Sequence, residues 1–290
     1  MNQPTAKIKH ITATKDLSLE RLLNIHLKGC NTQAIITSGG VWCNQIRILN
    51  PKRIIHQNET IKVYISPTQG YRYAFSDELI IKETSEWVIV YKEPLITISM
   101  DRSNQFFNLM AGFNDFYGFK NMSNGVQPIT RLDYRVPGLA LFSKTKKAER
   151  YLFKQMQQRR IKKRYKIIVD GTNYKNWYRL SNQLSVTHKA TASSLGKKAK
   201  SAFVKVAEIK DQTIFDVSTQ TGRRHQIRCH AADTINPILN DELYGYRSKN
   251  RHIPIGLIAT ELKFQWNQQN VHVKIQDKWL KHWLDGLCFK

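Results

Sequence analysis

Apolar residues near the N-terminus repeat with helical spacing. Between residues 19 and 27 the leucines fall at i, i+3, i+4 and i+8, so they line one face of a short helix. Ser18 or Asp16 can cap its start, and Gly29 can end it. A second short helix is predicted at residues 32–37. Strands are predicted at residues 41–44 and 61–65.

A turn-forming segment, residues 66–70, separates this part from the rest, because it contains both proline and glycine. We therefore predict a small α+β domain at residues 9–66 and a larger domain at residues 67–290. In the larger domain, helices are predicted at residues 150–160 and 279–284. Strands are predicted at residues 87–91, 139–142, 165–169, 203–206, 214–217 and 271–275. Many strands with scattered helices predict an α+β fold and not repeated β-α-β units.

The net charge of the chain limits the classes of partner that it can bind. Its 290 residues include 46 Lys and Arg against 22 Asp and Glu, a formal net charge of +24. Such an excess favours nucleic acid or an anionic membrane surface as a partner. No apolar stretch is long enough for a membrane span, and residues 1–7 lack the apolar core of a secretory signal. Nucleic acid is therefore the preferred partner, with no membrane association.

The cysteines give no sign of a disulfide framework or a metal site. Their spacing contains no Cys-x-x-Cys pair, which suits free thiols in a reducing compartment such as the cytoplasm. The four are Cys30, Cys43, Cys229 and Cys288. Cys229 lies near His225 and His230, but no second pair with ligand spacing accompanies them, and the intervening arginines would repel a cation. We predict no bound metal, and we expect both histidines to be hydrogen-bonded structural residues.

Two polar segments are candidates for catalysis. Thr130-Arg131-Leu132-Asp133 places a carboxylate beside an arginine, just before the apolar run at residues 139–142. Far downstream, residues 221–230 form a basic, glycine-led segment. An acid in a loop before a strand and a distant basic segment can meet in one site. In so basic a chain, that site is expected to act on RNA.

With these motifs in view, the chain resembles the RluA-type family of RNA pseudouridine synthases. The family's His-Arg-Leu-Asp and Gly-Leu-x-Leu-Phe-x-Lys-Thr motifs match residues 130–133 and 138–145. Its Lys-x-Tyr and Gly-Arg-x-His-Gln-Ile-Arg-x-His motifs match residues 163–165 and 222–230, and Pro-Ile-Leu-x-Asp-x-x-Tyr-Gly matches 237–245. The resemblance covers roughly residues 87–264. It implies a mixed, largely antiparallel β-sheet flanked by helices and loops.

The N-terminal residues 9–66 resemble the S-four RNA-binding module that often precedes this catalytic domain. The likeness rests on the leucine helix and on Gly40-Val41-x-x-Asn44. The catalytic part departs from the family pattern in places. Thr130 and Ile258 stand where members usually have histidine, and residues 134–137 replace a more usual Arg-Asp-Thr-Ser. These changes flank the catalytic positions and do not remove them.

The resemblance implies a reaction that breaks the bond between uracil and ribose, turns the base and rejoins it through carbon 5. Nothing is oxidised or lost, so no cofactor is expected. Asp133 would be the catalytic carboxylate, which either attacks the sugar or assists departure of the base. Arg228 would grip Asp133 through two parallel hydrogen bonds. Tyr165 would pack against the target base and offer its hydroxyl for proton transfer.

Further residues are candidates for substrate binding. Arg131 and Arg223 either hold the motif loops or contact RNA. Leu257 and Leu262 either wall the uracil pocket or belong to the core. The run that contains Lys162 and Lys163 is expected to contact phosphates, although a solvated face is the usual place for such a run.

Two functions remain open. The preferred one is a monomeric enzyme that forms pseudouridine in structured RNA, with ribosomal RNA favoured over transfer RNA by family analogy. The alternative is a catalytically silent RNA-binding protein of the same fold that assists RNA folding or ribosome assembly, and Thr130 and Ile258 favour it. A metal-dependent nuclease lacks the carboxylate cluster that two metal ions require.

Overall fold

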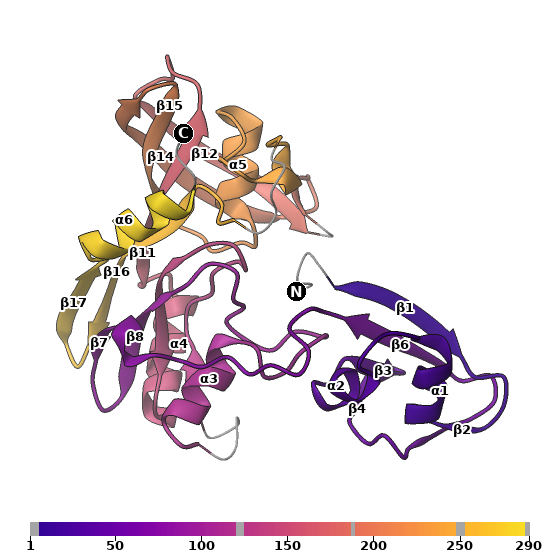
Figure 1. Cartoon of the computed structure of the whole chain (residues 1–290). Coiled ribbons are helices and arrows are strands. Elements are labelled where there is room, and N and C mark those ends of the chain that lie inside the picture. Colours follow the sequence, from indigo (N-terminus) through magenta and orange to yellow (C-terminus); the bar gives the residue numbers. More distant parts are fainter. Residues whose placement is uncertain (1–5, 120–124, 187–188, 248–252, 288–290) are drawn as a thin grey trace. The chain divides into compact units, whose positions relative to one another are not determined.

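The computed structural model describes residues 6–119, 125–186, 189–247 and 253–287, and it contains two compact units (Figure 1). The first unit comprises Met1–Phe75 and Ile96–Gly125, and the second comprises Ser76–Leu95 and Val126–Lys290. These units differ from the two predicted domains in two respects, since residues 67–75 and residues 96–125 both group with the N-terminal segment. The likeness of that segment to an S-four module stays a prediction.

The first unit contains a four-stranded antiparallel sheet in the order β1-β6-β3-β4 and a separate pair of strands, β2 and β5. Its elements are β1 (Lys7–Thr12), β2 (Leu17–Ser18), α1 (Leu19–His26), α2 (Thr32–Thr37), β3 (Val41–Cys43), β4 (Ile46–Ile48), β5 (Ile54–Ile55), β6 (Thr60–Ile65) and α3 (Leu109–Phe116). The two predicted helices are confirmed, and the hydroxyl of Ser18 caps α1 by accepting from the amide of Arg21. The buried leucines of α1 pack with apolar residues of the sheet and form the core of the unit.

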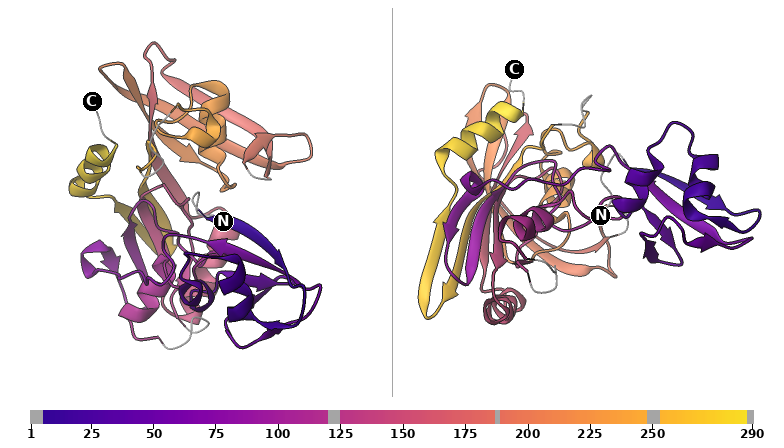
Figure 2. Two further views of the ribbon diagram at one scale, coloured as in Figure 1. Left: turned by 45° about the vertical axis from the view of Figure 1, so that its right-hand side comes forward. Right: turned by 60° about the horizontal axis from the view of Figure 1, so that its bottom comes forward.

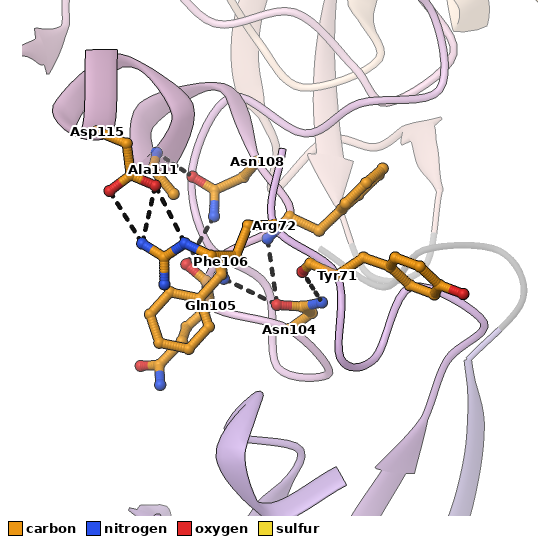
Figure 3. Close-up of polar contacts among 9 residues, drawn as sticks. Tyr71, Arg72, Asn104, Gln105, Phe106, Asn108, Ala111 and Asp115 are labelled. Carbon is orange, nitrogen blue, oxygen red and sulfur yellow. Dashed lines mark hydrogen bonds and ion pairs between the residues drawn. The ribbon is translucent and has the colours of Figure 1, made fainter. Parts of the chain in front are cut away.

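Residues 96–119 are joined to residues 66–72 through buried and exposed polar contacts (Figure 3). The side chain of Asn104 is fully buried and donates to the carbonyl oxygens of Thr68 and Tyr71. Its oxygen accepts from the backbone amides of Phe106 and Phe107. Nearby, Arg72 donates to both carboxylate oxygens of Asp115 at 2.8–3.1 Å, and its guanidinium lies 4.5 Å from the ring centre of Phe106. These contacts explain why the segment belongs to the first unit.

The second unit is built on one mixed sheet of 11 strands. Nine strands form the path β13-β12-β14-β15-β11-β16-β10-β8-β7, while β17 pairs with β16 and β9 pairs with β10. The strands are β7 (Ile80–Glu83), β8 (Trp87–Lys92), β9 (Gln127–Pro128), β10 (Gly138–Ser143), β11 (Lys162–Asp170), β12 (Trp177–Val186), β13 (Ala190–Ala192), β14 (Lys197–Ile209), β15 (Gln212–Thr219), β16 (Leu257–Trp266) and β17 (Gln269–Lys274). Each predicted strand of this part lies wholly or mostly within one of these.

Helices flank the sheet, as Figures 1 and 2 show. They are α4 (Lys146–Gln157), α5 (Gln226–Thr234) and α6 (Asp277–Gly286), with short 3-10 turns η1 (Asp77–Leu79) and η2 (Glu242–Tyr244). Helix α4 contacts β10, and α5 contacts β13 and β14. The helix predicted at residues 150–160 is shifted, because Thr145 caps α4 by accepting from the amide of Ala148. Among the described residues, no helix combines the length and apolar character that a bilayer span requires.

The close approach of strands β10 and β16 positions the motif loops of the second unit. Among the described strands of this sheet, β10 and β16 pair in parallel and the other neighbouring strands are antiparallel. Gly138 begins β10 with φ of 120°, and a Cβ atom there would lie 2.3 Å from the carbonyl oxygen of Ala259. A larger residue would push the two strands apart. The predicted mixed, largely antiparallel α+β architecture is confirmed.

We expect Asn104→Ala to destabilise the first unit by about 2–4 kcal/mol, because the buried Asn104 side chain bonds to four backbone groups, which would lose this partner. Urea unfolding followed by circular dichroism measures the change. Gln33→Ala is the matched control, since Gln33 is an exposed residue of α2 and its removal should change stability by less than about 0.5 kcal/mol. Equal stability of the two variants would contradict the anchoring role of Asn104.

Candidate active site

One pocket in the second unit is lined by both predicted motifs. Asp133 comes from the loop before β10, Tyr165 from β11 and Arg228 from the first turns of α5. Arg131, Arg223, Gly222, Leu257 and Ile227 are among the other residues that line it. The structure therefore brings together the acid and the basic segment that the sequence placed far apart.

Arg228 is the central contact of this pocket. Its Nη1 donates to Oδ2 of Asp133 at 3.0 Å, while its Nε and Nη2 donate to the two carboxylate oxygens of Asp241 at 2.6 and 2.8 Å. The guanidinium also lies 5.1 Å from the ring centre of Tyr244. The prediction that Arg228 forms two parallel hydrogen bonds with Asp133 is wrong. Arg228 forms two hydrogen bonds with Asp241 and one with Asp133.

The start of α5 fixes the direction of Arg228. His225 precedes the helix with φ of 56°, a left-handed conformation that turns the chain sharply into α5. The next residue, Gln226, accepts from the hydroxyl of Thr221 and the amide of Arg223, and it donates to the carbonyl oxygen of Lys200 and the hydroxyl of Ser201. The glycine-led loop is thus tied to β14 on one side and to α5 on the other.

Asp133 is held in its ionised form. Burial opposes its charge, but the charge and the hydrogen bond of Arg228 help to outweigh burial and lower the pKa of the carboxyl group below its usual value. Both contacts use Oδ2. Among the described residues, Oδ1 accepts no hydrogen bond, and the side chain keeps 24% of its surface exposed. The Oδ1 atom of Asp133 therefore takes no part in these two contacts, and the residue lines the pocket.

Tyr165 keeps its proton at neutral pH. Its side chain is 8% exposed, and burial together with the charge of Asp133 raises the pKa of the phenol well above its usual value. The residue pairs with Val217 of β15 and Ala259 of β16, next to an irregularity in the ladder between residues 164 and 165. The phenol can act as a hydrogen-bond donor beside Asp133.

His225 lies closer to Asp133 than the sequence led us to expect. Its Nδ1 is 3.1 Å from the hydroxyl of Tyr244, and its Nε2 is 3.6 Å from Oδ2 of Asp133. Burial lowers the pKa of the imidazole to about 4, so the ring is neutral at pH 7. The Tyr244 hydroxyl accepts from the amide of Ala190, which leaves its own proton for Nδ1 and favours a proton on Nε2, facing Asp133. His230 is hydrogen-bonded to Asn182, as predicted.

A buried lysine supports the Asp133 loop. Lys92, the last residue of β8, is fully buried and donates to its neighbour Glu93 and to the carbonyl oxygen of Tyr134, at 2.8 and 3.2 Å. On the other side of the motif, the Thr130 hydroxyl accepts from the amide of Leu141 at 2.9 Å. The threonine that replaces the family's histidine thus fastens the loop to β10.

Sequence reasoning missed Lys92 and the role of Asp241 in the site. Asp241 stands within the Pro-Ile-Leu-x-Asp motif, which is the signal that could have identified it. Lys92 carries no such signal, because a lysine at a strand end is ordinarily exposed. Ile258 is fully buried in β16 and belongs to the core.

The predicted substrate-binding residues fall into two groups. Arg131 and Leu257 line the pocket, and so does Arg223, whose Nε donates to the carbonyl oxygen of Lys198. Leu262 is buried in β16 and does not line the pocket. Lys162 is exposed, whereas the ammonium group of Lys163 lies beside Gly222 at the pocket.

The part of the chain described contains no group of three or more histidine, cysteine, aspartate and glutamate side chains arranged to hold a metal. Cys30, Cys43 and Cys229 are free thiols. Cys288 lies outside the described residues.

Residues 86–233 match the model of a protein family described as RNA pseudouridylate synthase. The chain is 25% identical to an RNA pseudouridine synthase of Aquifex aeolicus, over 74% of this chain and 72% of that protein. It is also 25% identical to ribosomal large subunit pseudouridine synthase C of Yersinia pestis, over 82% and 76%. Ribosomal large subunit pseudouridine synthase D of Vibrio cholerae is 30% identical over 50% of this chain and 45% of its own length.

Two solved human structures have a similar fold. RNA pseudouridylate synthase domain containing 4 superposes with a TM-score of 0.59 at 14% identity, over 72% of this chain and 93% of its own. RNA pseudouridylate synthase domain containing 1 gives 0.58 at 19% identity, over 70% and 85%. At these identities the likeness concerns the fold alone.

Lys92 should make stability depend on pH. Burial lowers its pKa to about 7, although Asp133 and Glu93 act in the opposite direction, whereas an unfolded lysine has a pKa of about 10.4. Between these values the unfolded chain holds one proton more, so rising pH should stabilise the wild type by about 1.4 kcal/mol per pH unit relative to Lys92→Met.

Urea unfolding between pH 7 and 9 measures this difference. Lys82→Met, an exposed residue of β7, is the control, and its stability should stay within about 0.5 kcal/mol of the wild type at each pH. If the free energy of unfolding changed with pH in the same way for the wild type and Lys92→Met, Lys92 would not lose its proton in this range.

Proposed function

Because the chain belongs to the RNA pseudouridylate synthase family, we propose that it converts uridine to pseudouridine in ribosomal RNA with Asp133 as its catalytic carboxylate and without a cofactor. The observation that carries the proposal is the meeting of Asp133, Tyr165 and Arg228 in one pocket. Isomerisation neither adds nor removes atoms, so the protein must supply charge, orientation and an enclosed site.

The ionised Asp133 acts at the sugar or on the departing base. Its Oδ1 is the reactive atom, since Oδ2 is engaged by Arg228. Arg228 keeps the carboxylate charged in a partly buried site, and Asp241 keeps Arg228 in place. Both mechanisms require an ionised carboxylate oxygen at the bond between base and sugar, and this arrangement provides one.

Tyr165 packs against the target base. Its phenol stays protonated next to Asp133, and its hydroxyl is available for proton transfer within the isomerisation, which leaves Tyr165 protonated again at the end. A uridine within a helix must leave the stack to reach this pocket, at a cost of about a few kcal/mol. Arg131, Arg223 and Lys163 lie at the pocket and bind the phosphates on either side of the flipped nucleotide.

The names of the relatives support ribosomal RNA as the substrate. Two of them, from Yersinia pestis and Vibrio cholerae, are named as large-subunit pseudouridine synthases. The net charge of +24 suits a large, folded RNA. We propose that the enzyme is a monomer. We propose further that it works in the cytoplasm, which contains ribosomal RNA and is a reducing environment that suits its free thiols.

The alternative of a catalytically silent RNA-binding protein has less support. Its best evidence was Thr130 and Ile258, yet these residues fasten a loop and fill the core. Asp133, Tyr165 and Arg228 all remain, with the charge states that catalysis needs.

Asp133→Asn should abolish pseudouridine formation and leave RNA affinity within a few-fold, because the change removes charge and keeps size. Pseudouridines are mapped in cellular RNA after the gene is deleted and then restored as the wild type or the variant. This measurement identifies the modified uridine and also tests whether Asp133 is required. Wild-type turnover by Asp133→Asn would end the assignment of this carboxylate.

Arg228→Lys should lower the single-turnover rate on the order of 100-fold, because lysine cannot bond to Asp241 at two points and to Asp133 at once. RNA affinity should change little. Arg223→Lys in the same segment is the matched control, since Arg223 makes one side-chain bond to a backbone carbonyl and none to Asp133. A larger loss for Arg223→Lys would mean that the two arginines have exchanged roles.

A further inference from the structure

The four-stranded sheet of the first unit has one face covered by helices and one face without them (Figure 1). Along β3 and β6, buried residues alternate with half-buried ones: Val41 and Cys43 flank Trp42, and Ile61 and Val63 flank Lys62. The buried set packs in the core with α1 and α2. Because neighbouring side chains of a strand point to opposite faces, Trp42 and Lys62 lie on the face away from the core.

The strand register places four side chains in one row across this face. His10 of β1 pairs with Lys62 of β6, Lys62 pairs with Trp42 of β3, and Trp42 pairs with Arg47 of β4. Cross-strand partners lie about 4.5–5.5 Å apart at their Cβ atoms, so the row is continuous. One aromatic ring therefore stands among three basic side chains.

Residues 96–125 add a fourth basic side chain to this face. The indole Nε1 of Trp42 donates to the carbonyl oxygen of Arg102 at 2.9 Å, and the Arg102 guanidinium donates to the hydroxyl of Tyr64 at 2.9 Å. The guanidinium groups of Arg47 and Arg102 lie 4.7 and 5.6 Å from the ring centre of Trp42. Two guanidinium planes and an indole are thus gathered at one point of the sheet.

The backbone beneath Arg102 is held firmly. Arg47 donates to the carbonyl oxygen of Asp101 and to the side chain of Gln105. Asn104 joins the same turn to Thr68 and Tyr71, and Figure 3 shows its contact with Tyr71. The arrangement of Trp42, Arg47 and Arg102 is therefore set before any ligand binds, which reduces the entropy lost on binding.

A pocket of about 380 Å³ lies on this face. Pockets for small ligands span about 300–1,000 Å³. Its lining includes His10, Trp42, Lys62 and Arg102, together with amides and a hydroxyl, and none of the described residues that line it has a carboxylate. The pocket thus offers positive charge, hydrogen-bonding groups and an aromatic surface.

We propose that this sheet face binds an unpaired, single-stranded segment of RNA. A base stacks on the exposed part of the Trp42 ring or on the guanidinium planes beside it, and Lys62 and Arg102 contact the phosphates. The proposal rests on RNA being the substrate, and it adds a second contact region in the first unit. The described residues of the pocket lining include no acidic side chain, which suits an anionic ligand. The aromatic ring among the basic groups favours an RNA strand over an acidic peptide, because a base can stack on it.

The test measures binding of a labelled oligoribonucleotide made of cytidines alone to the full-length protein. Such a strand stays unpaired and contains no uridine, so no reaction accompanies binding. Trp42→Leu should weaken binding on the order of tenfold or more. Lys62→Gln should lower the slope of log affinity against log salt concentration by about 0.7.

Two matched controls use the same types of residue elsewhere. Lys9 is the neighbour of His10 in β1, on the opposite face of the sheet, and Lys9→Gln should leave affinity within about twofold. Trp177→Leu removes an exposed tryptophan of the second unit and should have no effect. Circular dichroism checks that Trp42→Leu folds; if it does not, the comparison of Lys62→Gln with Lys9→Gln decides.

Equal effects of Lys62→Gln and Lys9→Gln, or unchanged binding for both Trp42→Leu and Lys62→Gln, would overturn the proposal. Pseudouridine formation by the wild type is measured separately on ribosomal RNA. Failure there would remove the proposed function and leave the binding result for the sheet face as it stands.

Discussion

The active site depends on one shared guanidinium group. Arg228 makes a two-point ion pair with Asp241 and a single bond to Asp133, and these three residues come from separate segments of the chain. Burial alone would disfavour every charge in this group. Together, two carboxylates and one guanidinium satisfy one another, and Asp133 stays ionised with one oxygen facing the pocket. Asp241 contacts Arg228, and Arg228 in turn contacts Asp133.

The rest of the site serves to hold the Asp133 loop against α5. Thr130 fastens the loop to β10, and Lys92 holds it from β8. Gly138 lets β10 approach β16 closely enough for their parallel pairing. His225 turns the chain into α5 and places its own ring beside Asp133. The geometry around Asp133 therefore depends on the mixed sheet, since these contacts attach the loop to β8 and β10 and hold β10 against β16.

The first unit shows a similar dependence on contacts between distant residues. Its sheet alone would present Trp42, Lys62 and Arg47 in a row. Residues 96–125 add Arg102 and the backbone carbonyl that orients the indole. This segment lies within the stretch that matches the family model, yet it packs with the N-terminal unit. The chain enters the second unit at Ser76, goes back to the first unit at Ile96 and enters the second unit again at Val126. A single domain boundary in the sequence cannot describe this path.

The sequence alone determined the helix at residues 32–37, a cap at Ser18 or Asp16 for the first helix, the strand beginning at Trp87, and the two polar segments that meet in the pocket. These features depend on neighbours within one helical turn or on alternation along one strand, so local patterns contain them. The helix α5 was missed because its apolar spacing is weak and its buried residues include Gln226, Arg228 and His230. Only the tertiary structure decided that Arg228 is shared with Asp241, that Lys92 is buried under the motif loop, and that Arg102 joins Trp42. Each of these contacts joins residues from different segments, and their energies depend on burial and geometry that exist only after the chain has folded.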